Sequence, residues 1–283
     1  MSGGREPVKA TFWLLEAPDS LALQSRREPD GTGLGAFTAA GEPVVFKQPL
    51  AAFEDHEFAS EAREVSSRNF VAHVRYASTG AVNLRNTHPF EQHGRLFAHN
   101  GVIGALDQLE HELGDARSLV GGDTDSERFF ALITREIERT REIGAGIVSA
   151  ATWVADHLPV LSLNFILITG SQLWALRYPD MHELHLLERE PGGPSGGRHL
   201  EHASARGSIR VRSGQLADRP AVVVATERMD EDAGWRSMQS GELLHVDADL
   251  RVQITRPLVR PPAYPLSLSD LDPKAAASQG APA

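Results

Sequence analysis

Cysteine is absent from this chain of 283 residues. Without thiols the chain can form neither disulfides nor thiolate metal sites, and no residue of the sequence as it stands can act as a cysteine nucleophile. Lysine is scarce as well, because only Lys9, Lys47 and Lys274 accompany 25 arginines. We interpret that imbalance as coding bias, so it carries little information about function.

Long apolar runs and basic clusters are also missing. The first residues contain no apolar stretch long enough for a signal peptide, and no window approaches the roughly 18 apolar residues of a membrane-spanning helix. The formal net charge of -10 and the lack of a basic cluster argue against a surface that binds phosphates. We therefore expect a cytoplasmic protein that binds neither nucleic acid nor a membrane.

The remaining composition, 41% hydrophobic and 23% charged, is that of an ordinary globular chain. Short apolar runs between turn residues predict strands, and apolar residues at helical spacing predict helices. The strands are predicted over residues 34–37, 44–47, 70–74, 96–99, 163–169, 173–177, 221–226, 243–246 and 250–254. The helices are predicted over residues 10–25, 56–66, 106–113, 126–142 and 146–158.

This order of elements, strands before and after a pair of long helices, favours an α+β layered fold over alternating βαβ units. We expect one domain over residues 1–256. Residues 188–220 are rich in Gly, Arg and Ser and predict a long loop insertion. Residues 257–283 are rich in Pro and Ala and predict a disordered tail.

Polar side chains suited to binding a small zwitterion are concentrated between His73 and Glu127. Arg75 follows an apolar strand and precedes a turn of small residues, where a guanidinium can hold a carboxylate with two hydrogen bonds. Asn100 and Gly101 follow the strand over residues 96–99, where a side-chain amide and a backbone N–H can form an oxyanion hole. Taken singly, a structural salt bridge and a tight turn explain these residues better.

The segment over residues 122–127, Gly-Asp-Thr-Asp-Ser-Glu, precedes a predicted helix. Thr124 and Glu127 have the spacing of a capping box, which accounts for one acidic residue of the segment. The other Asp is then available to bind an ammonium group.

The 12 histidines do not show the spacing of a metal site. No HExxH motif occurs, and we expect the histidines to be satisfied structural residues rather than ligands. The glycines of residues 31–35 follow a GxGxG spacing and precede strand-like residues, so they do not predict a dinucleotide site. We therefore expect no metal and no cofactor.

Taken in order, four short motifs resemble the glutaminase domain of class II glutamine amidotransferases, an N-terminal-nucleophile family. They are Arg-Tyr-Ala-Ser-Thr-Gly at residues 75–80, Asn-Thr-His-Pro at 86–89, His-Asn-Gly at 99–101 and Thr-Asp-Ser-Glu at 124–127. The resemblance extends over about residues 10–255 and is nearest to the stand-alone type, since no synthase domain follows. It implies a four-layer αββα fold, here without its first strand.

The resemblance also implies roles for individual residues. Arg75 would hold the α-carboxylate of glutamine and Asp125 its α-ammonium, with Ser78 and Thr79 also binding substrate. The Asn100 side chain and the Gly101 N–H would form the oxyanion hole. His88 and His99 would support the site. The implied activity is hydrolysis of the side-chain amide of glutamine or of a γ-glutamyl compound, as a hydrolase or as a transferase with a separate synthase or acceptor protein.

The nucleophile of that family is an N-terminal Cys, which this chain lacks. Our preferred explanation is that residues of the form Cys-x-Leu/Ile-x-Gly precede Met1, so that the chain as given is truncated and inactive. Residues 2–7 contain no apolar residue and cannot form the buried strand that the nucleophile would head. The alternatives are a noncatalytic glutamine-binding or regulatory pseudoenzyme and, less favoured, Ser2 as nucleophile after removal of Met1.

Overall fold

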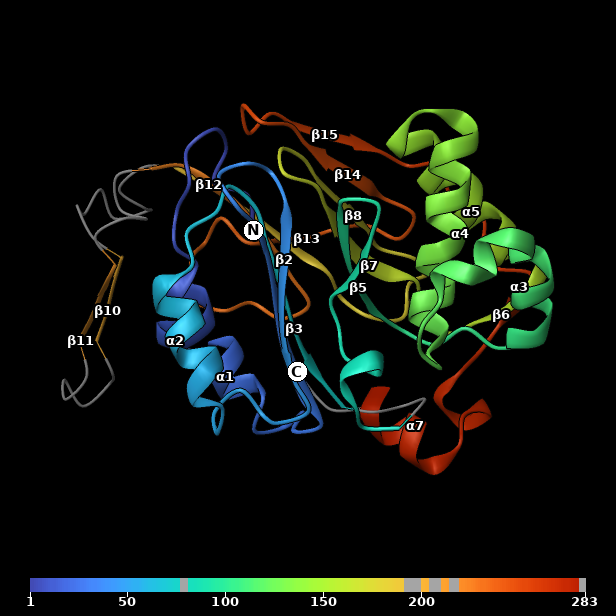
Figure 1. Cartoon of the computed structure of the whole chain (residues 1–283), viewed down its shortest axis with the longest axis horizontal. Coiled ribbons are helices and arrows are strands. Elements are labelled where there is room, and N and C mark those ends of the chain that lie inside the picture. The colour runs from blue at the N-terminus through green and yellow to red at the C-terminus, as the bar shows by residue number, and fades with distance from the viewer. Residues whose placement is uncertain (77–80, 191–199, 204–209, 214–218, 280–283) are drawn as a thin grey trace.

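Two stacked layers of β-sheet form the centre of the computed structural model, which describes residues 1–76, 81–190, 200–203, 210–213 and 219–279 (Figure 1). The first layer contains two three-stranded sheets, ordered β2-β1-β3 and β12-β9-β13. Their strands are β1 (Gly31–Phe37), β2 (Pro43–Gln48), β3 (Phe70–Arg75), β9 (His185–Arg189), β12 (Ala221–Ala225) and β13 (Arg236–Ser237). Every pairing within these two sheets is antiparallel.

The second layer is one six-stranded antiparallel sheet, ordered β15-β14-β8-β7-β5-β4. Its strands are β4 (Phe90–Gln92), β5 (Arg95–Asn100), β7 (Asn164–Ile168), β8 (Leu173–Leu176), β14 (Leu243–Val246) and β15 (Val252–Thr255). Strands β7 and β8 are apolar at most positions because both faces of this sheet are covered.

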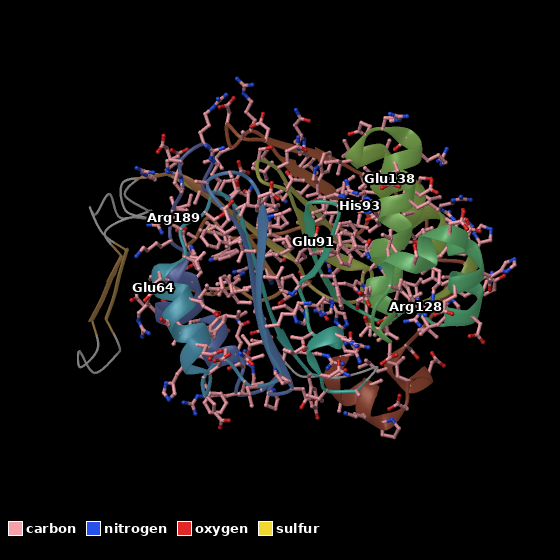
Figure 2. The ribbon with its side chains drawn as sticks, in the orientation of Figure 1. Glu64, Glu91, His93, Arg128, Glu138 and Arg189 are labelled. Carbon is pink, nitrogen blue, oxygen red and sulfur yellow. The ribbon has the colours of Figure 1, made fainter. Side chains whose placement is uncertain are left out.

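Helices cover the outer face of each sheet layer, as Figure 1 shows. Outside the first layer lie η1 (Phe12–Glu16), α1 (Leu21–Gln24) and α2 (His56–Glu64). Outside the second lie α3 (Leu106–Leu113), η3 (Gly114–Leu119), α4 (Asp125–Thr140) and α5 (Ile143–His157). Figure 2 shows His93, in the β4–β5 turn, beside Glu138 of α4, whose carboxylate its Nδ1 contacts. The expected four-layer αββα arrangement is therefore confirmed.

Three apolar clusters fill the spaces between these layers. The first packs α4 and α5 on the six-stranded sheet, with Phe97 stacked on Phe130 at 4.7 Å between ring centroids. The second joins η1, α1 and α2 to the outer face of the first layer, and includes Met1, Trp13 and Trp235. The third lies between the two sheets. The site described below sits where the second and third clusters meet.

One predicted helix, over residues 10–25, is divided in the structure. The chain forms η1, turns at Ala17 and Pro18, and then forms the single turn of α1. Proline lacks the N–H that a continuous helix needs and clashes with the preceding turn. The other predicted helices correspond to α2, α3, α4 and α5, and the nine predicted strands all have counterparts.

The structure contains short strands and helices in two segments that the sequence predicted to be a loop and a disordered tail. The segment 188–220 includes β10 (Leu200–Ala203) paired with β11 (Arg210–Ser213). The segment from residue 257, expected to be disordered, instead contains β16 (Tyr264–Pro265), η4 (Leu268–Asp270) and α7 (Pro273–Gln279) among its described residues. Strand β16 pairs in parallel with β6 (Pro159–Val160), a long-range contact that local composition does not encode. The last short element is η2 (Leu84–Asn86).

Candidate active site

A cavity of about 180 Å³ opens between the ends of β3 and β5 and the start of α4. It brings together residues that lie far apart in the sequence. The lining includes Arg75, Asn100, Gly101, Asp125, His73, His88 and His99, together with Met1 and Asn164. The structure thus gathers every described residue that the sequence assigned to the site. Ser78 and Thr79, also predicted to bind substrate, lie outside the described residues.

Arg75 ends β3 and is only 4% exposed, although it carries a guanidinium. Its Nη1 donates a hydrogen bond to the carbonyl oxygen of Ala81 at 3.2 Å. Burial lowers the pKa of Arg75, while the nearby carboxylates of Asp30 and Asp125 act in the opposite direction. The pKa of an arginine is high enough for this side chain to stay protonated, so it places a buried positive charge in the cavity.

Asp125 is the first residue of α4, and the helix end determines where its carboxylate points. Thr124 caps the helix by accepting a hydrogen bond from the Glu127 N–H at 3.2 Å, which is one of the two bonds of the predicted capping box; the Glu127 carboxylate instead accepts from the N–H of Gly121 and of Gly122. Asp125 accepts hydrogen bonds from the N–H of Ile103 and of Ser126, both at 2.9 Å. The Asp125 carboxylate also accepts a hydrogen bond from the Ser126 hydroxyl at 3.4 Å, and these bonds fix its direction at the start of α4.

Asn100 and Gly101 leave the end of β5 beside the loop that precedes β7. Asn100 pairs with Asn164 in the sheet, and its carbonyl oxygen accepts a hydrogen bond from the Ser162 hydroxyl at 3.1 Å. A Cβ at Gly101 would lie 1.9 Å from the Ser162 carbonyl oxygen, so only glycine permits this approach. The tight packing fixes the direction of the backbone at the predicted oxyanion hole.

His99 links the loop before β7 to the start of α4. Its Nε2 donates to the Ser162 carbonyl oxygen at 3.1 Å, and its Nδ1 accepts from the Ser126 hydroxyl at 2.9 Å. Burial lowers the pKa of His99, which favours the neutral ring in which Nδ1 is the acceptor. His99 thus connects the loop packed against Gly101 to the residue that follows Asp125.

His73 and His88 form a second buried pair, with ring centroids 4.3 Å apart. Burial lowers the pKa of His73 to about 3, and burial next to other cationic groups holds the pKa of His88 well below its usual value. Both rings are therefore neutral near pH 7 and add no positive charge beside Arg75. Among the described residues, no group of three or more His, Asp or Glu side chains is arranged to hold a metal ion.

Asn164, Glu28 and Gln279 are among the lining residues that were not predicted from the sequence. Asn164 begins β7 and accepts a hydrogen bond from the Tyr178 N–H at 2.9 Å. Glu28 lies in the same cavity, and its burial, reinforced by Glu227, raises its pKa to about 7. Gln279 of α7 contacts the cavity and accepts a hydrogen bond from His182 at 2.9 Å. No local pattern indicated any of them, because each depends on a long-range contact.

Met1 and Ser2 extend along the edge of β3. Met1 and Phe70 exchange two backbone hydrogen bonds, at 2.8 and 2.9 Å. Ser2 bridges Asn69 on one side and Val222 on the other. Because Ser2 lies opposite Asn69, six residues before Arg75, the two are about 20 Å apart along the strand. Ser2 therefore lies far from the predicted substrate groups.

The fold and the cavity together define an N-terminal-nucleophile type of hydrolase architecture with a buried Arg, Asp and Asn-Gly site. A family model described as glutamine amidotransferases class-II matches residues 20–263. The chain belongs to that family.

Related proteins share much of the chain's length. A putative glutamine amidotransferase of Haemophilus influenzae is 28% identical, covering 75% of this chain and 71% of its own length. The gamma-glutamyl-hercynylcysteine sulfoxide hydrolase of Mycobacterium tuberculosis is 28% identical over 84% of this chain and 88% of its own. An uncharacterised protein of Methanocaldococcus jannaschii is 30% identical over 80% of this chain, which spans 63% of that relative's length.

Solved structures agree on the fold. The phosphoribosylpyrophosphate amidotransferase of Bacillus subtilis superposes with a TM-score of 0.59 at 17% identity, covering 91% of this chain and 48% of that one. A glutamine aminotransferase class-II domain protein of Silicibacter pomeroyi gives a TM-score of 0.53 at 19% identity, covering 80% and 91%. Within the described residues, no helix is both long and apolar enough to cross a membrane.

Proposed function

We propose that this protein, with a Cys-headed segment ahead of Met1, hydrolyses the side-chain amide of glutamine or of a γ-glutamyl compound. The observation that carries the proposal is the shared cavity of Arg75, Asp125, Asn100 and Gly101. A buried guanidinium and a buried carboxylate at one site suit the two charged ends of a free amino acid. The residues present would recognise the glutamyl group, and the chain as given would be inactive.

The chemistry follows from where these groups lie. Arg75 would bind the α-carboxylate and Asp125 the α-ammonium, which directs the side-chain amide toward Asn100 and Gly101. A thiolate would attack the amide carbon, and the Asn100 amide and the Gly101 N–H would stabilise the oxygen that becomes negative. Ammonia or an amine would leave with a proton returned from the base, the α-amino group of the Cys. Water would then hydrolyse the thioester to release glutamate.

Ser2 is a poor alternative nucleophile. Its backbone N–H and carbonyl are both bonded to Val222, and its hydroxyl accepts a hydrogen bond from the Gly4 N–H at 3.5 Å. The separation of about 20 Å from Arg75 along the strand also excludes direct attack on a substrate held there. We therefore retain a nucleophile ahead of Met1 as the proposal.

The substrate class is wider than glutamine. A relative from Mycobacterium tuberculosis is named a gamma-glutamyl-hercynylcysteine sulfoxide hydrolase, whose printed substrate carries a γ-glutamyl group on a larger amine. A glutamyl-binding site built from Arg75 and Asp125 recognises the part that glutamine and such compounds share. We propose that a γ-glutamyl amide is the substrate and that any synthase or acceptor is a separate protein.

A noncatalytic module that binds glutamine or regulates a partner is the second candidate. It is favoured by one observation: the recognition groups are gathered in a chain that contains no cysteine.

Glutaminase assays separate the two candidates. A mature chain that begins Cys-Ala-Leu-Ala-Gly before Met1 is compared with the chain as given and with a matched chain that begins with Ser. Release of ammonia from glutamine, or of amine from a γ-glutamyl anilide, by the Cys-headed chain alone is the expected result. Binding of glutamine by all three chains without any hydrolysis would favour the noncatalytic module.

A further inference from the structure

The end of α7 forms part of the wall of the cavity. Ser278 and Gln279 line the same cavity as Arg75 and Asn100. Both side chains are half-buried, so they are neither free in solvent nor part of an apolar core. The proposed function gives this wall no role.

Long-range contacts hold α7 at this place. The segment before it is fixed by the parallel pairing of β16 with β6 and by a hydrogen bond from the Tyr178 hydroxyl to the Arg260 carbonyl oxygen at 3.0 Å. Asp272 caps the helix by accepting from the N–H of Lys274 at 3.0 Å and of Ala275 at 3.1 Å. Ala275 is only 3% exposed. The end of α7 therefore packs as a defined part of the cavity wall.

Three contacts in succession connect the predicted oxyanion hole to α7. Asn100 pairs with Asn164 in the six-stranded sheet. The Asn164 Nδ2 donates a hydrogen bond to the His182 carbonyl oxygen at 3.1 Å. The His182 Nε2 in turn donates to the Gln279 Oε1 at 2.9 Å. Gln279 thus lies on the side of the cavity that continues from Asn100 through Asn164, and both of these residues also line it.

The Gln279 amide has donors as well as the acceptor that His182 occupies. A side-chain amide carries two N–H groups on its nitrogen, and among the described residues no hydrogen bond involves the Gln279 Nε2. Burial lowers the pKa of His182, so its ring is neutral near pH 7 and adds no positive charge beside Gln279. A pair of neutral N–H donors suits a carbonyl or carboxylate oxygen of a ligand.

The proposed orientation of the substrate brings its far end to this wall. Arg75 and Asp125 would hold the α-carbon end of a glutamyl group, and the amide would lie at Asn100 and Gly101. The amine portion, beyond the amide nitrogen, then extends away from the α-carbon, past Asn100 toward α7. Glutamine has no atoms beyond that nitrogen, so the wall contacts only larger γ-glutamyl amides.

We propose that Gln279 determines specificity for the amine portion of the substrate, by donating a hydrogen bond to an oxygen that this portion carries. The substrate class is a γ-glutamyl amide with a carboxylate or carbonyl oxygen close to the amide nitrogen, as in a γ-glutamyl amino acid. His182 is a positioning residue, because it holds the Gln279 oxygen and leaves the N–H groups for the ligand. The inference deepens the proposed function and rests on its glutamyl-binding site, but it does not depend on the nucleophile.

Calorimetry on the chain as given tests this contact with two matched ligands. γ-Glutamylglycine and γ-glutamylethylamide share the glutamyl group and the amide, and only the first has a carboxylate on its amine portion. We expect γ-glutamylglycine to bind about 10-fold more tightly, as a hydrogen bond to a charged group allows. The ratio of the two affinities is the measured quantity, because any change in glutamyl binding affects both ligands equally.

Two substitutions of Gln279 and one control identify the residue responsible. Gln279→Ala should bring the two affinities to within about 2-fold of each other. Gln279→Glu keeps an acceptor oxygen for His182 but places a carboxylate beside that of γ-glutamylglycine, so it should reverse the preference. Gln108→Ala, which removes an exposed glutamine of α3 outside the cavity, should leave the 10-fold ratio unchanged.

The outcomes separate this inference from the proposed function. Equal affinities of the chain as given for the two amides, with glutamine also bound, would overturn the contact and leave the glutamyl-binding site intact. A preference for γ-glutamylglycine that survives both Gln279 substitutions would likewise overturn it, since another residue would then make the contact. If neither amide nor glutamine bound, the glutamyl-binding site itself would be refuted, and this inference with it.

Discussion

Gly101 gives the sharpest test of how the site is built. Replacing it by Ala would place a Cβ 1.9 Å from the Ser162 carbonyl oxygen and 2.6 Å from its carbonyl carbon. Non-bonded carbon contacts are comfortable near 3.5–4.0 Å, so one backbone segment must move by about 1 Å or more. Both segments belong to or adjoin paired strands, which limits how far they can relax.

The cost of Gly101→Ala can be worked from the contacts that would be disturbed. Overpacking a filled interior costs roughly 1–3 kcal/mol. Displacing the Ser162 carbonyl also strains the hydrogen bond from His99, and an unsatisfied buried polar group adds about 1–3 kcal/mol. Because partial relaxation reduces both terms, we expect the free energy of unfolding to fall by about 2–4 kcal/mol.

Urea unfolding of the chain as given measures this loss, with Gly121→Ala as the matched control. A Cβ at Gly121 would meet only Glu127 Oε1, at 3.8 Å, so that variant should unfold within about 0.5 kcal/mol of the unsubstituted chain. A Gly101→Ala chain as stable as the Gly121→Ala chain would show that the approach of β5 to the Ser162 loop is not as tight as described.

Three further predictions concern charge, rate and pH. Arg75→Lys in the Ser-headed extended chain should weaken glutamine binding about 10-fold or more in calorimetry, because Lys cannot make two parallel hydrogen bonds to a carboxylate. The control, Arg85→Lys at an exposed position, should leave the affinity unchanged. If both variants bound glutamine as tightly as the unsubstituted chain, Arg75 would not be part of the binding site. Asn100→Ala in the Cys-headed chain should lower kcat on the order of 100-fold; a change confined to KM would contradict an oxyanion role. Burial lowers the pKa of the Met1 α-amino group from its ordinary 8.0 to about 5 in the folded chain. The folded state therefore binds fewer protons than the unfolded state between these values, and the free energy of unfolding should fall by about 4 kcal/mol in total as the pH drops from 8 toward 5. Urea unfolding of the chain that retains Met1, verified by mass, should show this dependence of the free energy of unfolding on pH. N-terminal acetylation should remove the dependence. The same dependence with and without acetylation would refute a buried amine.

The ordered motifs and most of the secondary structure could be predicted from the sequence because both depend on neighbouring residues. Thr124 caps α4 as predicted, although the Glu127 carboxylate accepts from the N–H groups of Gly121 and Gly122 rather than completing a capping box. Apolar runs such as Val222 to Val224 became buried strands. The grouping of Arg75, Asn100 and Asp125 was also predicted, through the resemblance to a family rather than from spacing. The hydrogen bonds that hold these side chains in place could not be predicted from the sequence.

The sequence by itself therefore determined the family, the order of the main strands and the residues of the site that we propose to bind a glutamyl group. Only the tertiary structure decided how the site is held together: Ser162 packs against Gly101, His99 links the loop before β7 to the start of α4, and α7 lies against the cavity. It also decided that Met1 and Ser2 lie between the edges of β3 and β12. The physical reason is that periodicity and caps are local, whereas strand neighbours, close backbone approaches and burial arise from contacts between segments many residues apart.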